Sequence, residues 1–131
     1  MDPIEKIYME SKTIAVVGAS DNPKRPSYDV ARYLQSEGFK IIPVNPALKE
    51  LFGEKSYPDV LSIPEPVDVV DIFRNPDAVP EIVEQAIVKK AKVVWMQPGA
   101  ENMQAAERAT EAGLEVIMGV CMMKEHRALK S

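Results

Sequence analysis

The chain has 131 residues, of which 46% are hydrophobic and 27% are charged, and its formal net charge is -4. This length and composition predict one globular domain, residues 1–131, with a core of its own. The acidic balance argues against a general nucleic-acid binder, whose surface would be broadly basic. The apolar runs are too short to span a membrane. With a single cysteine, no internal disulfide and no secretory leader pattern, we expect a cytoplasmic protein.

Strand-like and helix-like segments alternate along the chain. Helices are expected at 3–10, 28–37, 76–87 and 101–112, with a final helical turn within 124–130. Strands are expected at 13–17, 40–44, 67–73, 91–96 and 114–118. Smaller expectations are an N-cap at Ser27, a short strand near 55–57 and a helical turn near 59–62. The alternation predicts an α/β, three-layer Rossmann-like fold with a mainly parallel sheet of about five to six strands flanked by helices.

The most informative stretch follows the first expected strand. Residues 13–17 form an apolar run that stops at Gly18, and a polar loop then leads into a helix. This is the strand–loop–helix opening of a mononucleotide-binding unit. Backbone N–H groups and the helix N-terminus can hold a phosphate there, and Lys24 and Arg25 add positive charge. The sequence therefore predicts a phosphorylated ligand.

The residues at the other strand ends limit which class of ligand can bind, because ligands of such sheets bind beyond the carboxyl ends of the strands. A NAD site requires Gly-x-Gly-x-x-Gly after the first strand and an acid at the end of the second. Here the first turn has only Gly18, and the second strand ends at Val44-Asn45. NAD is therefore disfavoured. Lys24, Arg25 and Arg74 suit a ligand with an additional phosphate, which leaves coenzyme A and NADP open.

Six segments in chain order resemble one family. The chain is similar to the small stand-alone coenzyme A-binding proteins of bacteria and archaea, which are related to the coenzyme A-binding domain of the succinyl-CoA synthetase α subunit. The resemblance covers nearly the whole chain. The matching segments are IAVVGAS (14–20), RPSY (25–28), PVNP (43–46), VDVVDIFR (67–74), VWMQ (94–97) and EH (125–126).

The resemblance implies a role for each strand end. Gly18, Ala19 and Ser20 would line the pyrophosphate, and Lys24, Arg25, Pro26 and Ser27 would complete the phosphate site. Val44, Asn45 and Pro46 would border the adenosine, and Phe73, Arg74 and Pro76 would border the nucleotide from the other side. Gln97 and Gly99 would lie toward the pantetheine arm. Many members carry Asp-Arg directly before the cysteine, where this chain has Gly119-Val120, so the resemblance supports binding more strongly than chemistry.

These observations predict a binding or regulatory module for coenzyme A or an acyl-CoA, without catalysis of its own. One alternative is a small acyl-CoA-processing enzyme that uses Cys121 and His126 as nucleophile and base, with Glu125 orienting the base. Another is binding of NADP or a different nucleotide. No ligand spacing suggests a metal site, and neither nucleic acid nor membrane is expected as a partner. A homodimer or an unidentified protein partner stays open.

Overall fold

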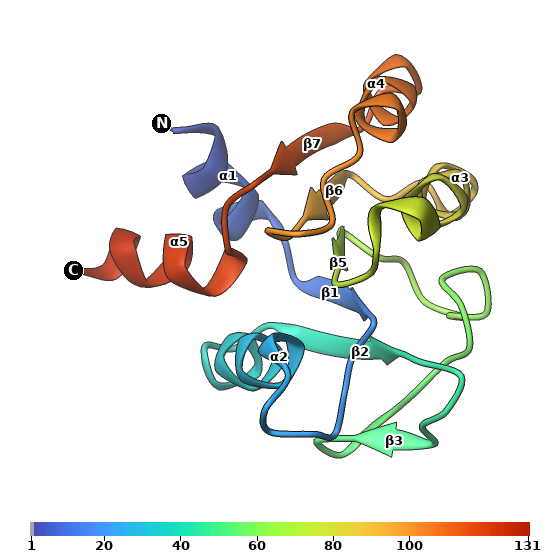
Figure 1. Cartoon of the computed structure of the whole chain (residues 1–131). Helices are drawn as coiled ribbons and strands as arrows, with labels where there is room; N and C mark the ends of the chain where they lie inside the picture. The colour runs from blue at the N-terminus through green and yellow to red at the C-terminus, as the bar shows by residue number, and fades with distance from the viewer. Residues whose placement is uncertain (1) are drawn as a thin grey trace.

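A parallel sheet of five strands forms the centre of the computed structural model, which describes residues 2–131 (Figure 1). The strand order is β2-β1-β5-β6-β7, so the order reverses direction between β1 and β5. The expected Rossmann-like α/β fold is therefore confirmed. A separate antiparallel pair is formed by β3 (Glu50–Leu51) and β4 (Glu54–Lys55). The strands of the main sheet are β1 (Thr13–Val17), β2 (Lys40–Val44), β5 (Val69–Ile72), β6 (Val93–Met96) and β7 (Glu115–Met118).

The strands are level at their carboxyl ends. Val17 lies opposite both Val44 and Ile72, Ile72 lies opposite Met96, and Met96 lies opposite Met118. The four strands other than β7 are almost continuous apolar runs, as expected for parallel strands that are buried on both faces. The turns that follow the strands are therefore collected along one edge of the sheet.

Helices cover both faces of the sheet and complete three layers (Figure 1). One face is covered by α1 (Pro3–Glu10), α2 (Pro26–Ser36) and α5 (Met122–Lys130), and α5 packs against both α1 and α2. The other face is covered by α3 (Val79–Lys89), which follows the short 3-10 helix η1 (Pro76–Ala78), and by α4 (Met103–Glu111). Small alanines of α4, namely Ala105, Ala106 and Ala109, are buried in that interface.

Four local expectations differ from the structure. Ser27 is not an N-cap: α2 begins at Pro26, Arg25 takes the cap position, and no side chain caps the helix. Pro26 fits the first helical position because the φ angle of proline is already helical and its missing N–H is not needed there. Residues 59–63 form a hydrogen-bonded turn without a helix. The short strand lies at 54–55, and the expected final turn is the longer helix α5.

A buried carboxyl group lies in the middle of the sheet. Asp71 of β5 lies in register between Val16 and Trp95, and its side chain is fully buried. Neither carboxyl oxygen has a hydrogen-bond partner among residues 2–131. Burial raises the pKa of Asp71 well above its usual range.

Candidate functional site

A cavity of about 790 Å³ opens at the edge where the strands end. Its walls come from the turns after β1, β2, β5 and β6, from the first turn of α2 and from the start of α5. This edge includes the point between β1 and β5 where the strand order reverses. In open α/β sheets, that is the position at which ligands bind.

Gly18 fixes the turn after β1. Its φ angle of 87° lies in the left-handed region, and a Cβ atom there would lie 2.2 Å from the carbonyl oxygen of Phe73. The amide of Gly18 donates to the carbonyl of Val44 at 3.0 Å, and the amide of Phe73 donates to the carbonyl of Val17 at 2.8 Å. Three strand ends therefore meet at this residue, and only glycine fits there.

The loop after Gly18 is held by its own hydrogen bonds. The side-chain amide of Asn45 donates to the carbonyl of Ala19 at 2.7 Å, and the amide of Asn22 donates to the hydroxyl of Ser20 at 3.0 Å. Within residues 2–131, no hydrogen bond uses the backbone N–H of Ala19, Ser20 or Ser27. The loop and the uncapped N-terminus of α2 thus present donors to the cavity, an arrangement that suits an anion.

The charges of the cavity lining also favour an anion. The lining includes the cations Arg25, Arg74 and Lys124 and a single acid, Asp29. None of these three cations forms an ion pair within the described part of the chain. Their charge is therefore not neutralised by the protein, and it is available to a negatively charged ligand.

Two buried side chains also present polar atoms to the cavity. Ser27 and Gln97 both line it and are each only 3% exposed. Gln97 Oε1 accepts a hydrogen bond from the amide of Met122 at 3.0 Å. Its Nε2 and the hydroxyl of Ser27 form no hydrogen bond among residues 2–131, and neither atom is enclosed by protein. Both residues line the cavity, so these polar atoms are open to a molecule bound there.

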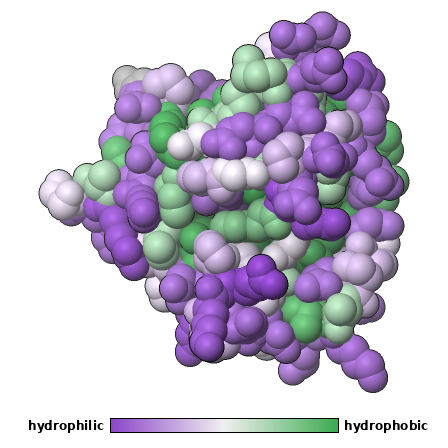
Figure 2. Space-filling model, in the orientation of Figure 1, coloured by the Kyte–Doolittle hydropathy of each residue, from purple (hydrophilic) through white to green (hydrophobic). Residues whose placement is uncertain are grey.

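The cavity lining combines this polar character with apolar surface. Figure 2 shows hydrophobic surface in the middle of the face seen in Figure 1, with hydrophilic residues on both sides of it. Ala19, Val30 and Met123 supply apolar atoms to the cavity, close to the cations of its rim. Such a mixture suits a ligand that has both a charged part and an uncharged arm.

A second hollow of about 280 Å³ adjoins the cavity. Val44, Pro46 and Ile82 contribute to its walls. Arg74 lines both hollows, so one guanidinium group lies between them.

The structure brings most of the predicted site residues together. Val44 and Pro46 line the second hollow, whereas Lys24 and Pro76 are exposed and line neither. The amide of Lys24 is bound to Asn22 Oδ1 in a turn at the outside of the loop. The predicted residues that line the cavity are Gly18, Ala19, Ser20, Arg25, Pro26, Ser27, Asn45, Phe73, Arg74, Gln97 and Gly99.

Other residues of the lining were not predicted as binding residues. Four of them lie close in sequence to predicted residues, and this closeness could have identified them as part of the site: Asp29, Asn75, Pro98 and Ala100. Cys121, Met123 and Lys124 come from the end of the chain. Their position follows from α5, which returns over the sheet beside α1 and α2 (Figure 1).

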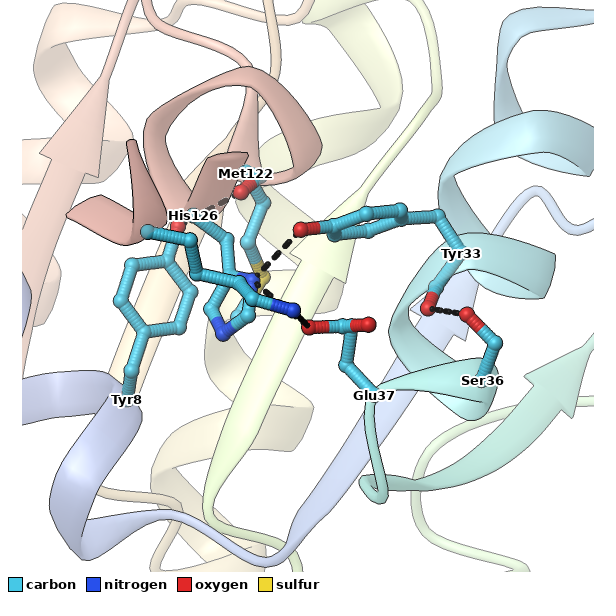
Figure 3. A network of polar contacts seen from close by, with 7 residues as sticks. Tyr8, Tyr33, Ser36, Glu37, Met122 and His126 are labelled. Atoms are coloured by element: carbon cyan, nitrogen blue, oxygen red, sulfur yellow. Dashed lines mark hydrogen bonds and ion pairs between the residues drawn. The ribbon is translucent and has the colours of Figure 1, made fainter. Parts of the chain in front are cut away.

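His126 belongs to a different cluster, with Tyr8, Tyr33 and Glu37 (Figure 3), and it is not part of the cavity lining. Its Nδ1 lies 2.7 Å from the hydroxyl of Tyr33 and 3.8 Å from Glu37 Oε1. Burial lowers the pKa of His126, and the carboxylate of Glu37 opposes this only in part. The hydroxyl of Tyr33 and His126 Nδ1 share this hydrogen bond, and the tautomer of the imidazole sets which of them donates.

Cys121 does not form a nucleophile–base pair with His126. Cys121 lines the cavity, and no hydrogen bond joins the two side chains within residues 2–131. Cys121 is the extended N-cap of α5, whereas His126 lies within the helix and is not part of the cavity lining.

Residues 2–131 contain neither a metal-binding cluster nor a membrane-spanning helix. No group of histidine, cysteine and acidic side chains in this range is arranged to hold a metal ion. In the same range, no helix has the length and apolar character needed to cross a membrane.

The fold and the cavity together define the class of protein. A parallel sheet whose strand order reverses beside a glycine turn, with a cavity at the reversal point, is the doubly wound α/β architecture, in which ligands bind at that position. Within that class, the chain belongs to the CoA binding domain family, whose model matches residues 12–127.

The chain is similar to proteins of about its own length and to a short part of longer ligases. It is 39% identical over 127 residues to the uncharacterized protein YneT of Bacillus subtilis (strain 168), covering 97% of this chain and 94% of YneT. A solved structure of a hypothetical protein from Pyrococcus horikoshii OT3 superposes with a TM-score of 0.95 and 46% identity, covering 98% of this chain and 90% of that one. Acetate–CoA ligase [ADP-forming] II of Archaeoglobus fulgidus is 36% identical over 83 residues, which are 62% of this chain and 12% of the ligase.

Proposed function

We propose that this protein binds coenzyme A, free or acylated, in the cavity at the carboxyl edge of the sheet. The observation that carries the proposal is the set of unpartnered donors at this edge. The amides of Ala19, Ser20 and Ser27 have no partner among residues 2–131, and these three residues line the same cavity as Arg25. A pyrophosphate group is the part of coenzyme A that this arrangement fits.

The two hollows suit the two ends of the ligand. The nucleotide would occupy the hollow lined by Val44 and Pro46. Arg74, between the hollows, is the cation that we assign to the ribose 3′-phosphate. The pantetheine arm would run in the opposite direction, past Gln97 and Gly99 toward the start of α5.

We propose further that the chain contributes binding without catalysis. It spans only 12% of the length of the ligase to which it is similar, so most of that enzyme has no counterpart in these 131 residues. The absence of a Cys121–His126 contact within the described residues also supports this. In this proposal, the bound coenzyme is presented to, or sensed by, another protein.

Calorimetric titration with coenzyme A, dephospho-coenzyme A and NADP tests the ligand. We expect one coenzyme A per chain. Dephospho-coenzyme A should bind more weakly, because it lacks the 3′-phosphate that we assign to Arg74. NADP should also bind more weakly, because its additional phosphate is at the 2′ position of the ribose. If this protein binds NADP more tightly than coenzyme A, the alternative from the sequence, binding of NADP or another nucleotide, is correct. No heat with coenzyme A would overturn the proposal.

A further inference from the structure

Cys121 is placed in the same cavity as the phosphate-binding loop. It follows β7, takes the N-cap position of α5 and is partly buried. One side of it packs against the hydrophobic cluster under α5, and it also lines the cavity together with Met123 and Lys124. The thiol is therefore accessible from the cavity, whereas His126 is not part of the lining.

An independent observation indicates that a ligand reaches this end of the cavity. Gln97 is 3% exposed, its Oε1 holds the first amide of α5, and its Nε2 has no partner among residues 2–131. This amide nitrogen belongs to a largely buried side chain that lines the cavity, so it can donate to an acceptor there, such as an amide carbonyl of a bound molecule. Gln97 contacts α5 one residue after Cys121, so that acceptor would lie near the thiol.

The separation of the two ends matches the proposed ligand. The strand order places β6 two strands and β7 three strands from β1, so Gln97, which holds the first amide of α5, and the end of β7 lie about 10 and 14 Å across the edge from the turn at Gly18. The pantetheine arm of coenzyme A is an extended chain of comparable length. It contains two amide groups and ends in a thiol. A pyrophosphate on the Gly18 loop therefore directs the thiol of the ligand toward Cys121.

Resting on the proposed function, we infer that Cys121 forms a mixed disulfide with coenzyme A when the coenzyme is supplied as its symmetrical disulfide. The thiolate of Cys121 attacks one sulfur atom of the coenzyme A disulfide. A bond forms between Cys121 Sγ and that sulfur, the original S–S bond breaks, and the second coenzyme A leaves as a thiolate that takes a proton from water. The cavity then holds a covalently attached coenzyme A, and no other oxidant is consumed.

The reaction can be followed by intact-protein mass spectrometry of the reduced full-length protein. Incubation with coenzyme A disulfide is expected to add the mass of one coenzyme A less two hydrogen atoms. Pantethine is the matched reagent, because it has the same reactive end and lacks the nucleotide. We expect the coenzyme A disulfide to react at least about tenfold faster at equal low concentration, since binding raises the effective concentration of the disulfide at the thiol.

Two variants assign the reaction to the site. Cys121→Ser is expected to show no mass gain. Arg25→Glu is expected to slow the reaction with coenzyme A disulfide and to leave the rate with pantethine unchanged, because only the former depends on the phosphate loop. Equal rates for the two disulfides in the wild-type protein would overturn the inference, since Cys121 would then be reacting as an ordinary exposed thiol.

Calorimetry with reduced coenzyme A separates the two proposals. If reduced coenzyme A binds and no adduct forms with the disulfide, the inference about Cys121 is wrong and the proposed function stands. If reduced coenzyme A does not bind at all, the proposed function fails, and the directed reaction of Cys121 fails with it.

Discussion

The two edges of the sheet differ in whether their polar groups have partners within the protein. At the amino edge, Asp68 Oδ2 accepts hydrogen bonds from the amides of Lys12 and Thr13 at 2.8 and 3.0 Å, and Asp68 Oδ1 lies 3.5 Å from Lys92 Nζ. Lys40, at the start of β2, pairs with Glu65 at 2.8 Å. The carboxylate of Asp68, the amides of Lys12 and Thr13, and the ammonium of Lys40 thus have partners within the chain.

At the carboxyl edge, the corresponding groups are left without partners. Arg25 and Arg74 form no ion pair, and the amides of Ala19, Ser20 and Ser27 form no hydrogen bond, within the described residues. Most turns at the amino edge are short, such as 11–12, 37–39, 90–92 and 112–114, whereas the turn after β1 at the carboxyl edge spans residues 18–25. The unpartnered polar groups named here lie on or next to the turns of the carboxyl edge and beside the cavity.

The largest expected effect is the substitution Gly18→Ala at the carboxyl edge. The new methyl group would lie 2.2 Å from a backbone oxygen and would also strain a left-handed backbone. We expect a loss of about 3 to 5 kcal/mol in the free energy of unfolding. Gly38→Ala is the matched control, because Gly38 has a φ angle of 97° and open space around it. Denaturant titration should show a loss of only about 1 to 2 kcal/mol there. Equal losses would contradict the role given to Gly18.

At the amino edge, Asp68→Ala removes the acceptor of two amides, and we expect a loss of about 2 to 3 kcal/mol. Burial raises the pKa of Asp68, but the amides of Lys12 and Thr13 together with Lys92 outweigh it and hold the pKa below its usual value of 3.8. The stabilisation is therefore present above that value and is lost as the pH falls below it. Denaturant titration from neutral to acid pH measures both effects.

Glu65→Ala, at the same edge, is the control for that prediction. It removes a solvent-exposed ion pair and should change the stability by less than about 1 kcal/mol. Neither variant should alter the affinity for coenzyme A. A weakened affinity in Asp68→Ala would mean that the amino edge also takes part in binding.

Arg25→Glu tests the phosphate site by reversing one charge at the carboxyl edge. We expect about tenfold or greater weakening of coenzyme A binding, because a charge-assisted contact to the pyrophosphate is replaced by repulsion. Lys12→Glu makes the same charge change at the amino edge and should leave the affinity nearly unchanged. Calorimetry on both variants distinguishes a local contact from a general effect of net charge. Similar losses in the two would support only the general effect.

Asp71, between the two edges, gives the smallest expected effect, a change in pH dependence. Its raised pKa means that the folded state keeps a proton that the unfolded state releases above about pH 4. Its contribution to stability therefore decreases as the pH rises from that value toward the folded-state pKa. The free energy of unfolding is measured against pH for Asp71→Asn and for the wild type. Because both proteins keep His126, whose pKa is also shifted, the difference between the two curves reports Asp71 alone. Parallel stability curves would show that Asp71 does not titrate as described.

The sequence predicted the sheet well, because each parallel strand is a short apolar run bounded by glycine, proline or polar residues. The start of α2 was harder to predict. Ser27 has the preferred chemistry of an N-cap, yet Pro26 begins the helix and Ser27 turns into the cavity wall. Lys24 and Arg25 are neighbours with equal charge, and only the fold of the loop shows that Arg25 faces the cavity.

The residues near the chain end depend on tertiary structure. Cys121 and Lys124 reach the site because the glutamine after β6 and the tyrosine of α1 bind the first turn of α5. Gln97 supplies the acceptor for the amide of Met122, and the hydroxyl of Tyr8 donates to its carbonyl at 2.6 Å. Contacts between residues so far apart in sequence leave no periodic signal in either segment.

The most direct test of the contrast between the edges is an amide chemical-shift titration of the labelled protein with coenzyme A. We predict large shifts for the amides of Ala19, Ser20 and Ser27 at the carboxyl edge, and nearly unchanged signals for Lys12 and Thr13, whose amides are already bound to Asp68. Unmoved signals in the Gly18 loop, or shifts concentrated at the amino edge, would contradict the account.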